Sequence, residues 1–232
     1  MKYMVKVNLV KKEESNIKGF ATVVFGGSFK ITNIAIIENR EKEQLFVSMP
    51  RYRSSERNED GSVLFKDVCN PITSDFRQEL YDKILAEYDS VKNNGLIQKV
   101  TEEVAEPPQF SVTVTPFERE GSNIRGLARI YFDDSFIVNN VNILQGKDKV
   151  FVAMPSYKTK QKDRDGKDIY QDICYPVTKD FRAKLYGEIE KAYEVAKNKQ
   201  VEESRDRVRN NSGDGRDSRG DNITGQSSAF SW

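Results

Sequence analysis

The sequence predicts an α+β fold made of two tandem modules, each a small antiparallel β-sheet followed by a C-terminal amphipathic helix. Three observations predict this fold. One set of sequence strings occurs twice in the same order, short segments alternate apolar and polar residues, and an apolar stripe with helical spacing closes each copy. Because the copies share one pattern on one chain, we expect them to pack together as an internal pseudo-dimer.

The internal repeat is dense enough to indicate a duplication. The string IKGFA at 17–21 recurs as IRGLA at 124–128, and FVSMP at 46–50 recurs as FVAMP at 151–155. Asp75-Phe76-Arg77 likewise recurs as Asp180-Phe181-Arg182. We therefore predict a first module at 1–92, a linker at 93–108, a second module at 109–198 and a tail at 199–232.

Four strands are predicted in each copy from alternation and from branched and aromatic residues. They cover 3–10, 20–25, 29–37 and 45–49 in the first copy, and 110–115, 127–132, 136–144 and 150–154 in the second. Gly26-Gly27 and Asp133-Asp134 lie between apolar runs and predict hairpin turns. Pro50 and Pro155 end the fourth strands because proline has no amide hydrogen to donate.

A polar hairpin and a helix complete each copy. The hairpin turns at Asp60-Gly61 or Asp165-Gly166, and Thr73 or Thr178 is placed to cap the helix that follows. The apolar stripe of each helix predicts packing against the sheet. Its members are Phe76, Leu80, Ile84, Tyr88 and Val91 in the first copy, and Phe181, Leu185, Ile189, Tyr193 and Ala196 in the second.

Composition argues against an enzyme. The chain has no histidine, and it has no glycine-rich phosphate loop, no serine beside a plausible base and no cluster with metal-ligand spacing. We therefore predict no catalytic residues, no metal and no cofactor. The two cysteines, Cys69 and Cys174, occupy the same place in the two copies, which favours a small buried side chain used twice rather than a disulfide.

The rest of the sequence indicates the cellular location of the protein and which of its segments are flexible. No stretch has the roughly 20 apolar residues of a spanning helix and the N-terminus lacks a signal-peptide core, so we expect a cytoplasmic protein without a membrane partner. The linker has weak amphipathic character and is expected to be partly helical. The tail is poor in aliphatic residues and is predicted to be disordered. Its end, Ala229–Trp232, is either a docking tip for a protein partner or simply the chain end, which is favoured.

The repeated strings resemble the SpoVG (stage V sporulation protein G) family of bacterial proteins. The resemblance is carried by FVSMP at 46–50 with Asp60-Gly61, Phe65 and Asp67-Val68, and by FVAMP at 151–155 with their counterparts in the second copy. It implies a sheet followed by a helix, a two-fold dimer of such units, and sequence-influenced binding of DNA or RNA in bacterial gene regulation. The family usually has one module per chain, so the fusion predicts an internal pseudo-dimer, and further self-association stays open.

Candidate nucleic-acid contacts cluster on the two polar hairpins. Positive side chains with interleaved tyrosines can contact phosphates and stack on bases. Acidic residues dilute the charge and the net charge of the chain is only +1, so the residues alone leave a solvated hairpin equally possible, and the family resemblance favours binding. The candidates are Arg51, Tyr52, Arg53, Arg57 and Lys66 in the first copy, and Tyr157, Lys158, Lys160, Lys162, Arg164 and Lys167 in the second.

Arg77 and Arg182 in the first helical turns complete the candidate set. Either they contact phosphate beside a structural acid, or they form ion pairs with Asp67 and Asp172, which is favoured. The alternative for the whole chain is a protein-interaction scaffold that uses its C-terminal tail.

Overall fold

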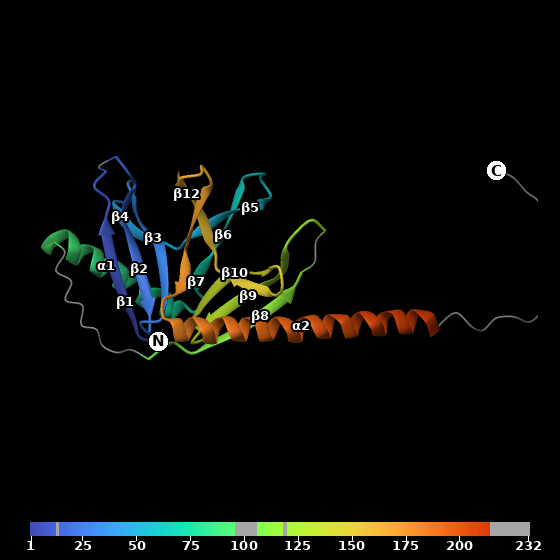
Figure 1. Cartoon of the computed structure of the whole chain (residues 1–232). Coiled ribbons are helices and arrows are strands. Elements are labelled where there is room, and N and C mark those ends of the chain that lie inside the picture. The colour runs from blue at the N-terminus through green and yellow to red at the C-terminus, as the bar shows by residue number, and fades with distance from the viewer. Residues whose placement is uncertain (13, 96–105, 118–119, 214–232) are drawn as a thin grey trace, which may run out of the picture. The chain divides into compact units, whose positions relative to one another are not determined.

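The structure, a computed structural model, describes residues 1–12, 14–95, 106–117 and 120–213 (Figure 1). Met1–Ala196 form one compact unit and the chain from Lys197 a second. The first copy contains β1 (Tyr3–Leu9), β2 (Ile17–Phe25), β3 (Phe29–Asn39), β4 (Gln44–Ser48), β5 (Arg51–Arg57), β6 (Val63–Asp67), β7 (Cys69–Pro71) and α1 (Ser74–Asn94). The second contains β8 (Phe110–Pro116), β9 (Ile124–Phe132), β10 (Phe136–Gln145), β11 (Val150–Ala153), β12 (Ser156–Lys162), β13 (Asp168–Asp172), β14 (Cys174–Pro176) and α2 (Lys179–Gly213).

The predicted fold class is confirmed: both copies are antiparallel sheets followed by a helix. The main strands pair as hairpins, β1 with β2 and β2 with β3, and equally β8 with β9 and β9 with β10. The predicted turns are present, with φ of 49° and 60° at Gly26 and Gly27 and of 45° and 49° at Asp133 and Asp134. Positive φ at both central residues is the type I′ geometry that matches the twist of paired strands.

The sequence did not predict that the two copies exchange a strand. The three-residue strand β7 of the first copy pairs with β10 of the second, and β14 of the second copy pairs with β3 of the first. One sheet therefore has the order β1-β2-β3-β14 with β4 also on β3, and the other has β8-β9-β10-β7 with β11 also on β10. Each sheet is completed by the other copy, so the pseudo-dimer is intertwined.

A β-bulge in each central strand makes room for this exchange. Asn33 in β3 and Asn140 in β10 have φ of 60° and 56°, a left-handed conformation that asparagine tolerates. At the bulges the backbone donors turn to the crossing chain: the Thr32 amide donates to the Ile173 carbonyl and the Asn139 amide to the Val68 carbonyl, each at 2.8 Å. Along one edge, each central strand therefore pairs with a strand of its own copy on one side of the bulge and with the exchanged strand of the other copy on the other side.

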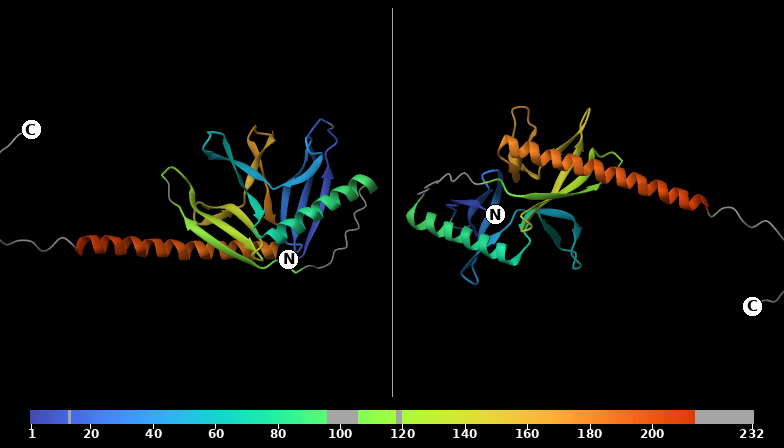
Figure 2. Two further views of the ribbon diagram at one scale, coloured as in Figure 1. Left: turned by 180° about the vertical axis from the view of Figure 1, so that it is seen from behind. Right: turned by 90° about the horizontal axis from the view of Figure 1, so that it is seen from below.

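The two helices begin as predicted. The hydroxyl oxygens of Thr73 and Thr178 accept from the amides of Phe76 and Phe181, each at 3.4 Å. The stripe of α1 is buried against its sheet, and in α2 the stripe is buried from Phe181 to Tyr193. Figure 2 shows α1 and the start of α2 on one side of the sheets and the β5–β6 and β12–β13 hairpins projecting from the other.

Helix α2 continues into the segment from residue 199 that composition predicted to be disordered. This stretch is rich in Lys, Glu, Gln and Arg, which are good helix formers, and Lys199 lies 3.9 Å from Glu203 in an i,i+4 ion pair. Residues 214–232, with the proposed docking tip at Ala229–Trp232, lie outside the described residues, as do residues 96–105 of the predicted linker.

The core between the copies is aromatic. Phe25 and Phe132 are equivalent positions, as are Phe29 and Phe136, and all four side chains are fully buried. The ring centroids of Phe25 and Phe136 are 5.0 Å apart, and the symmetry-related pair Phe29 and Phe132 is 4.7 Å apart. These contacts cross from one copy to the other, so the two modules share one core.

Both cysteines are free and buried, as predicted. They lie in the exchanged strands, and their side chains meet. A hydrogen bond with the Cys174 side chain, together with burial, raises the pKa of the Cys69 thiol. Each cysteine therefore serves as a small core side chain where the copies cross.

Candidate nucleic-acid interface

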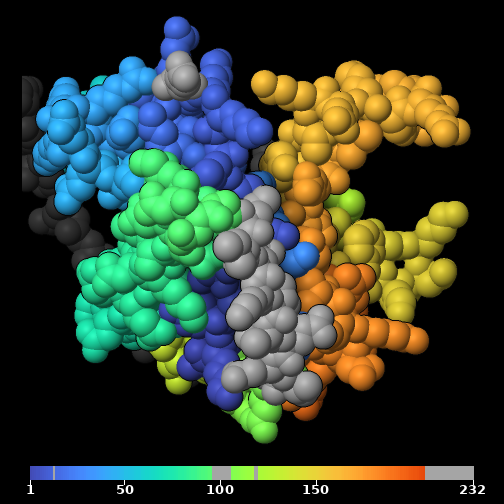
Figure 3. Space-filling view, turned by 90° about the vertical axis from the view of Figure 1, so that its left-hand side faces the viewer, coloured from blue at the N-terminus to red at the C-terminus, as the bar shows by residue number. Residues whose placement is uncertain are grey.

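The two polar hairpins project from the body of the molecule. In the first copy Arg51, Tyr52 and Arg53 of β5 lie opposite Asp67, Lys66 and Phe65 of β6. Both hairpins turn at the predicted glycines, with φ of 79° at Gly61 and 77° at Gly166. In the space-filling view the β12–β13 hairpin, in gold, stands out beyond the body, and α1, in green, covers the first sheet (Figure 3).

Each hairpin carries one aromatic ring that is exposed and lies directly opposite a basic residue. Phe65 is 57% exposed and pairs with Arg53, and Tyr170 is 63% exposed and pairs with Lys158. Directly opposite side chains project from the same face of a two-stranded ribbon. An aromatic beside a cation on one face can stack a base and contact its phosphate together.

The two tyrosines that the sequence singled out lie on the other face. Tyr52 and Tyr157 are half-buried and pack against the hydrophobic core. The Tyr157 hydroxyl donates to Oε1 of Gln171 at 2.8 Å. Phe65 and Tyr170 were therefore missed as candidates. Alternation along β6 and β13 shows that they share a face with Arg53 and Lys158, but not that this face is the exposed one.

Four of the predicted basic residues are held in ion pairs within their own hairpins. Nε of Arg51 is 2.8 Å from Asp67, and Nζ of Lys66 is 2.6 Å from Glu56. In the second copy Nζ of Lys158 and of Lys162 lie 2.6 and 3.7 Å from the two carboxylate oxygens of Asp168. These pairs are solvent-exposed and are worth about 0–1 kcal/mol, so a phosphate can compete for the cations.

Five further predicted cations are exposed and make no ion pair within the residues that the structure describes. They are Arg53 and Arg57 in the first hairpin, and Lys160, Arg164 and Lys167 in the second. Unpaired exposed cations are the ones that gain most from an added phosphate, because no protein carboxylate has to be displaced. The second hairpin therefore has more exposed, unpaired cations than the first.

Among the described residues, Arg77 and Arg182 do not form the favoured ion pairs with Asp67 and Asp172, although the Arg182 guanidinium still interacts electrostatically with Asp172. Nη2 of Arg77 donates to the Pro71 carbonyl at 3.0 Å, and Nη2 of Arg182 donates to the Pro176 carbonyl at 3.1 Å. Pro71 and Pro176 end the exchanged strands, so each arginine ties the first turn of its helix to the strand that crosses to the other copy. The partner of Asp67 is Arg51 instead.

Asp67 and Asp172 occupy equivalent positions in the two copies, but their environments differ. Asp67 lies opposite Arg51, whereas Asp172 lies opposite Ser156, which offers no charge. Asp172 is exposed, but partial desolvation raises the pKa of its carboxyl group, and the nearby Arg182 guanidinium only partly offsets that rise. The ionised Asp172 therefore costs free energy in the folded state, whereas Asp67 has a compensating cation.

We expect Asp172→Asn to raise the free energy of unfolding at pH 7 by up to about 0.5 kcal/mol, the range of surface substitutions. Because the folded-state pKa is raised, this cost is absent below the unfolded pKa of about 3.9 and is complete above the folded pKa. The gain should therefore vanish near pH 3. Asp67→Asn, which breaks an ion pair, should instead lower stability by about 0.2–1 kcal/mol at pH 7. Urea unfolding at the two pH values measures both, and a stabilising Asp67→Asn would contradict the assignment.

In the described part of the chain, no group of three or more His, Cys, Asp or Glu side chains could hold a metal ion. Among the same residues, no helix has the length and apolar character needed to cross a membrane.

Comparisons with known proteins agree with the repeat. A sequence model of the SpoVG family matches residues 1–90 and again 109–195. A protein of Phytoplasma australiense is 38% identical over 82 residues, covering 35% of this chain and 79% of that protein. Proteins of Thermoanaerobacter sp. (strain X514) and Clostridium beijerinckii are each 33% identical, over 90 and 92 residues, which cover 90% and 93% of those proteins. All three carry the name "Putative septation protein SpoVG".

The fold and the hairpins define a class: a duplicated α+β protein whose halves exchange strands and present two exposed hairpins that each carry basic and aromatic residues. The family match covers both copies, and so most of the chain. The chain belongs to the SpoVG family, which confirms the resemblance inferred from the repeated strings. Each relative corresponds to a single copy in length, so the present chain contains two family modules.

Proposed function

We propose that this protein is a nucleic-acid-binding regulator that contacts DNA or RNA with its two hairpins, in a binding rather than a catalytic role. The observation that carries the proposal is the pairing of an exposed aromatic with a cation on each hairpin, Phe65 with Arg53 and Tyr170 with Lys158. The pseudo-two-fold relation of the copies supplies two such ribbons on one compact unit. Membership of a family whose relatives are named as septation proteins supports a regulatory role.

The charge distribution supports local rather than global attraction. With a net charge of +1 the chain has no overall positive field, so affinity has to come from cations that are free to meet phosphates. Arg53, Lys160 and Arg164 are exposed and unpaired among the described residues. We therefore expect modest affinity with strong dependence on salt.

Fluorescence anisotropy tests the proposal, with labelled duplex DNA, single-stranded DNA and single-stranded RNA titrated between about 50 and 200 mM salt. We expect the logarithm of the binding constant to fall linearly with the logarithm of salt concentration. Single replacements of Arg53, Lys160 or Arg164 by glutamate should each weaken binding to each ligand and flatten this slope by about one, for one lost phosphate contact.

The matched control is Lys147→Glu, which makes the same charge change in an exposed loop away from the hairpins. It should leave the slope unchanged. No salt-sensitive binding to any of the three ligands, or equal losses for the control and the hairpin variants, would rule the proposal out. The comparison of ligands also decides between DNA and RNA.

A further inference from the structure

Among the residues that the structure describes, the strand β8 forms one edge of its sheet. It is the last strand in the order β11-β10-β9-β8, and its only partner strand among the described residues is β9. The Asp133 amide donates to the Gln109 carbonyl and the Phe117 amide to the Arg125 carbonyl, so the odd-numbered residues of β8 bond to β9. In an antiparallel ladder the alternate residues point the other way. The backbone groups of Phe110, Val112 and Val114 therefore face outward along the edge.

The equivalent edge in the first copy, β1, is blocked by its own side chains. Nζ of Lys83 donates to the Tyr3 carbonyl at 3.1 Å and lies 4.2 Å from the centroid of the Tyr3 ring. The Tyr3 hydroxyl donates to Glu79 at 2.9 Å. Lys6 also places a charge in the middle of β1, a common device against strand pairing.

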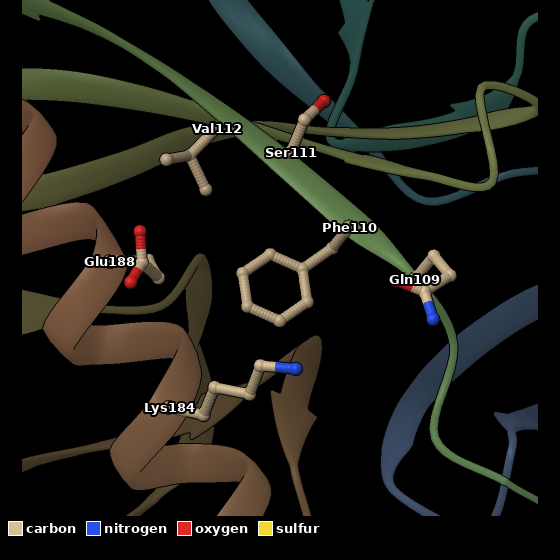
Figure 4. Close-up of a pocket in the computed structure, with 6 residues that line it drawn as sticks. All are labelled: Gln109, Phe110, Ser111, Val112, Lys184 and Glu188. Carbon is tan, nitrogen blue, oxygen red and sulfur yellow. The ribbon is translucent and has the colours of Figure 1, made fainter.

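In the second copy each of these blocking groups has changed. Phe110 replaces Tyr3, Lys184 replaces Glu79 and Glu188 replaces Lys83. The Lys184 ammonium lies 5.6 Å from the centroid of the Phe110 ring, but among the described residues it does not donate to the Phe110 carbonyl as Lys83 does to that of Tyr3. A cavity of about 190 Å³ opens instead between β8 and α2 (Figure 4). Thr113 stands where β1 has Lys6, which leaves β8 (FSVTVTP) without a charged residue.

We propose that the β8 edge pairs with the β8 edge of a second copy of this chain, antiparallel and about a two-fold axis at Thr113. The strand is self-complementary in that register. Val112 lies opposite Val114 of the second copy, Ser111 opposite Thr115, and Thr113 opposite itself. On the face toward α2, valine pairs with valine. On the exposed face, hydroxyl side chains pair with one another. Both kinds of cross-strand pair are favourable.

The hydrogen-bonding groups agree with this register. The outward amides and carbonyls of Val112 meet those of Val114 of the second copy, twice by symmetry. The amide of Phe110 meets the carbonyl of Pro116, and the missing amide hydrogen of Pro116 ends the pairing there. Such an isologous contact closes as a dimer rather than growing into a fibre. It does not depend on the proposed nucleic-acid binding, because β8 lies outside the hairpins.

Charge substitution at the axis tests the proposal. Thr113 does not bond to the new partner, so the two Thr113 side chains lie at the close, non-hydrogen-bonded spacing. Thr113→Lys installs the residue that β1 already carries, and two such lysines should repel, as should two glutamates in Thr113→Glu. We expect wild-type protein to dimerise in sedimentation velocity, and each variant to dimerise at least about tenfold more weakly.

Mixing the two variants should restore a dimer, because lysine then faces glutamate across the axis, and native mass spectrometry would detect this mixed species by its mass. Asn8→Lys, at an exposed position of the blocked β1 edge, is the control and should dimerise like wild type. Circular dichroism verifies the fold of each variant. Two results would overturn the proposal: wild-type protein that stays monomeric at all concentrations, or a dimer that Thr113→Lys does not weaken. The β8 edge would then be available to pair with a strand of a different protein.

Discussion

Replacing Phe25 by alanine is expected to lower the free energy of unfolding by about 3–5 kcal/mol and to destabilise both copies together. Phe25 is fully buried, and its ring lies 5.0 Å from that of Phe136 and 5.9 Å from that of Phe132, both in the other copy. Truncation removes these contacts and leaves a cavity in the core that the copies share. A loss of this size is a large share of the stability of a typical domain.

Calorimetry and urea unfolding measure this effect. Because β7 and β14 complete the opposite sheets, we expect one cooperative transition for the described core in both wild type and variant, shifted as a whole. Phe46→Ala is the matched control, since Phe46 is 46% exposed, and it should cost less than about 1 kcal/mol. Two separate transitions, with only the first copy affected by Phe25→Ala, would contradict a shared core.

Local features of the fold were predictable because their causes lie within a few residues. Gly26-Gly27 and Asp133-Asp134 predict hairpin turns since these residue types tolerate positive φ, and both turns are observed. Thr73 and Thr178 predict helix starts because a hydroxyl can accept from the amide three residues on, and both do. The repeat extended each such prediction to the second copy.

The strand exchange was not predictable in the same way. β7 and β14 have three residues each and end in proline, so they show no alternation that would reveal a strand. Their pairing joins segments far apart in the chain, and its determinants are the bulges at Asn33 and Asn140, which the sequence shows only as asparagines within apolar strands. Once the copies cross, Arg77 and Arg182 bond to the ends of the exchanged strands rather than to the predicted acids.

The structure places the candidate basic residues on the two hairpins, as the sequence predicts, but the exposed aromatic rings there differ from the predicted ones. Sequence order places Tyr52 and Tyr157 among the basic residues, and the sequence therefore predicts them as the stacking rings. The exchanged strand that follows each hairpin fixes which face of the ribbon turns toward the body, and that face carries the two tyrosines. The opposite face carries Phe65 and Tyr170, and these rings are the ones open to a ligand.

Replacing both Phe65 and Tyr170 by leucine is expected to weaken binding of single-stranded nucleic acid by at least about 30-fold. Stacking of a base on an aromatic ring contributes about 1–3 kcal/mol, and loss of two such contacts at the lower value gives that factor. Leucine keeps apolar volume at both exposed positions, so the fold and the charge of the hairpins should be retained. Anisotropy titration at one fixed salt concentration measures the loss.

The salt dependence and one conservative variant separate stacking from electrostatics. The leucine variant removes no cation, so its salt slope should equal that of wild type although its affinity is lower, the reverse of the glutamate variants at Arg53, Lys160 and Arg164. Tyr170→Phe retains the ring and should bind like wild type. If the leucine variant binds as tightly as wild type while the glutamate variants do not, the hairpins hold phosphates alone and the aromatic face takes no part in recognition.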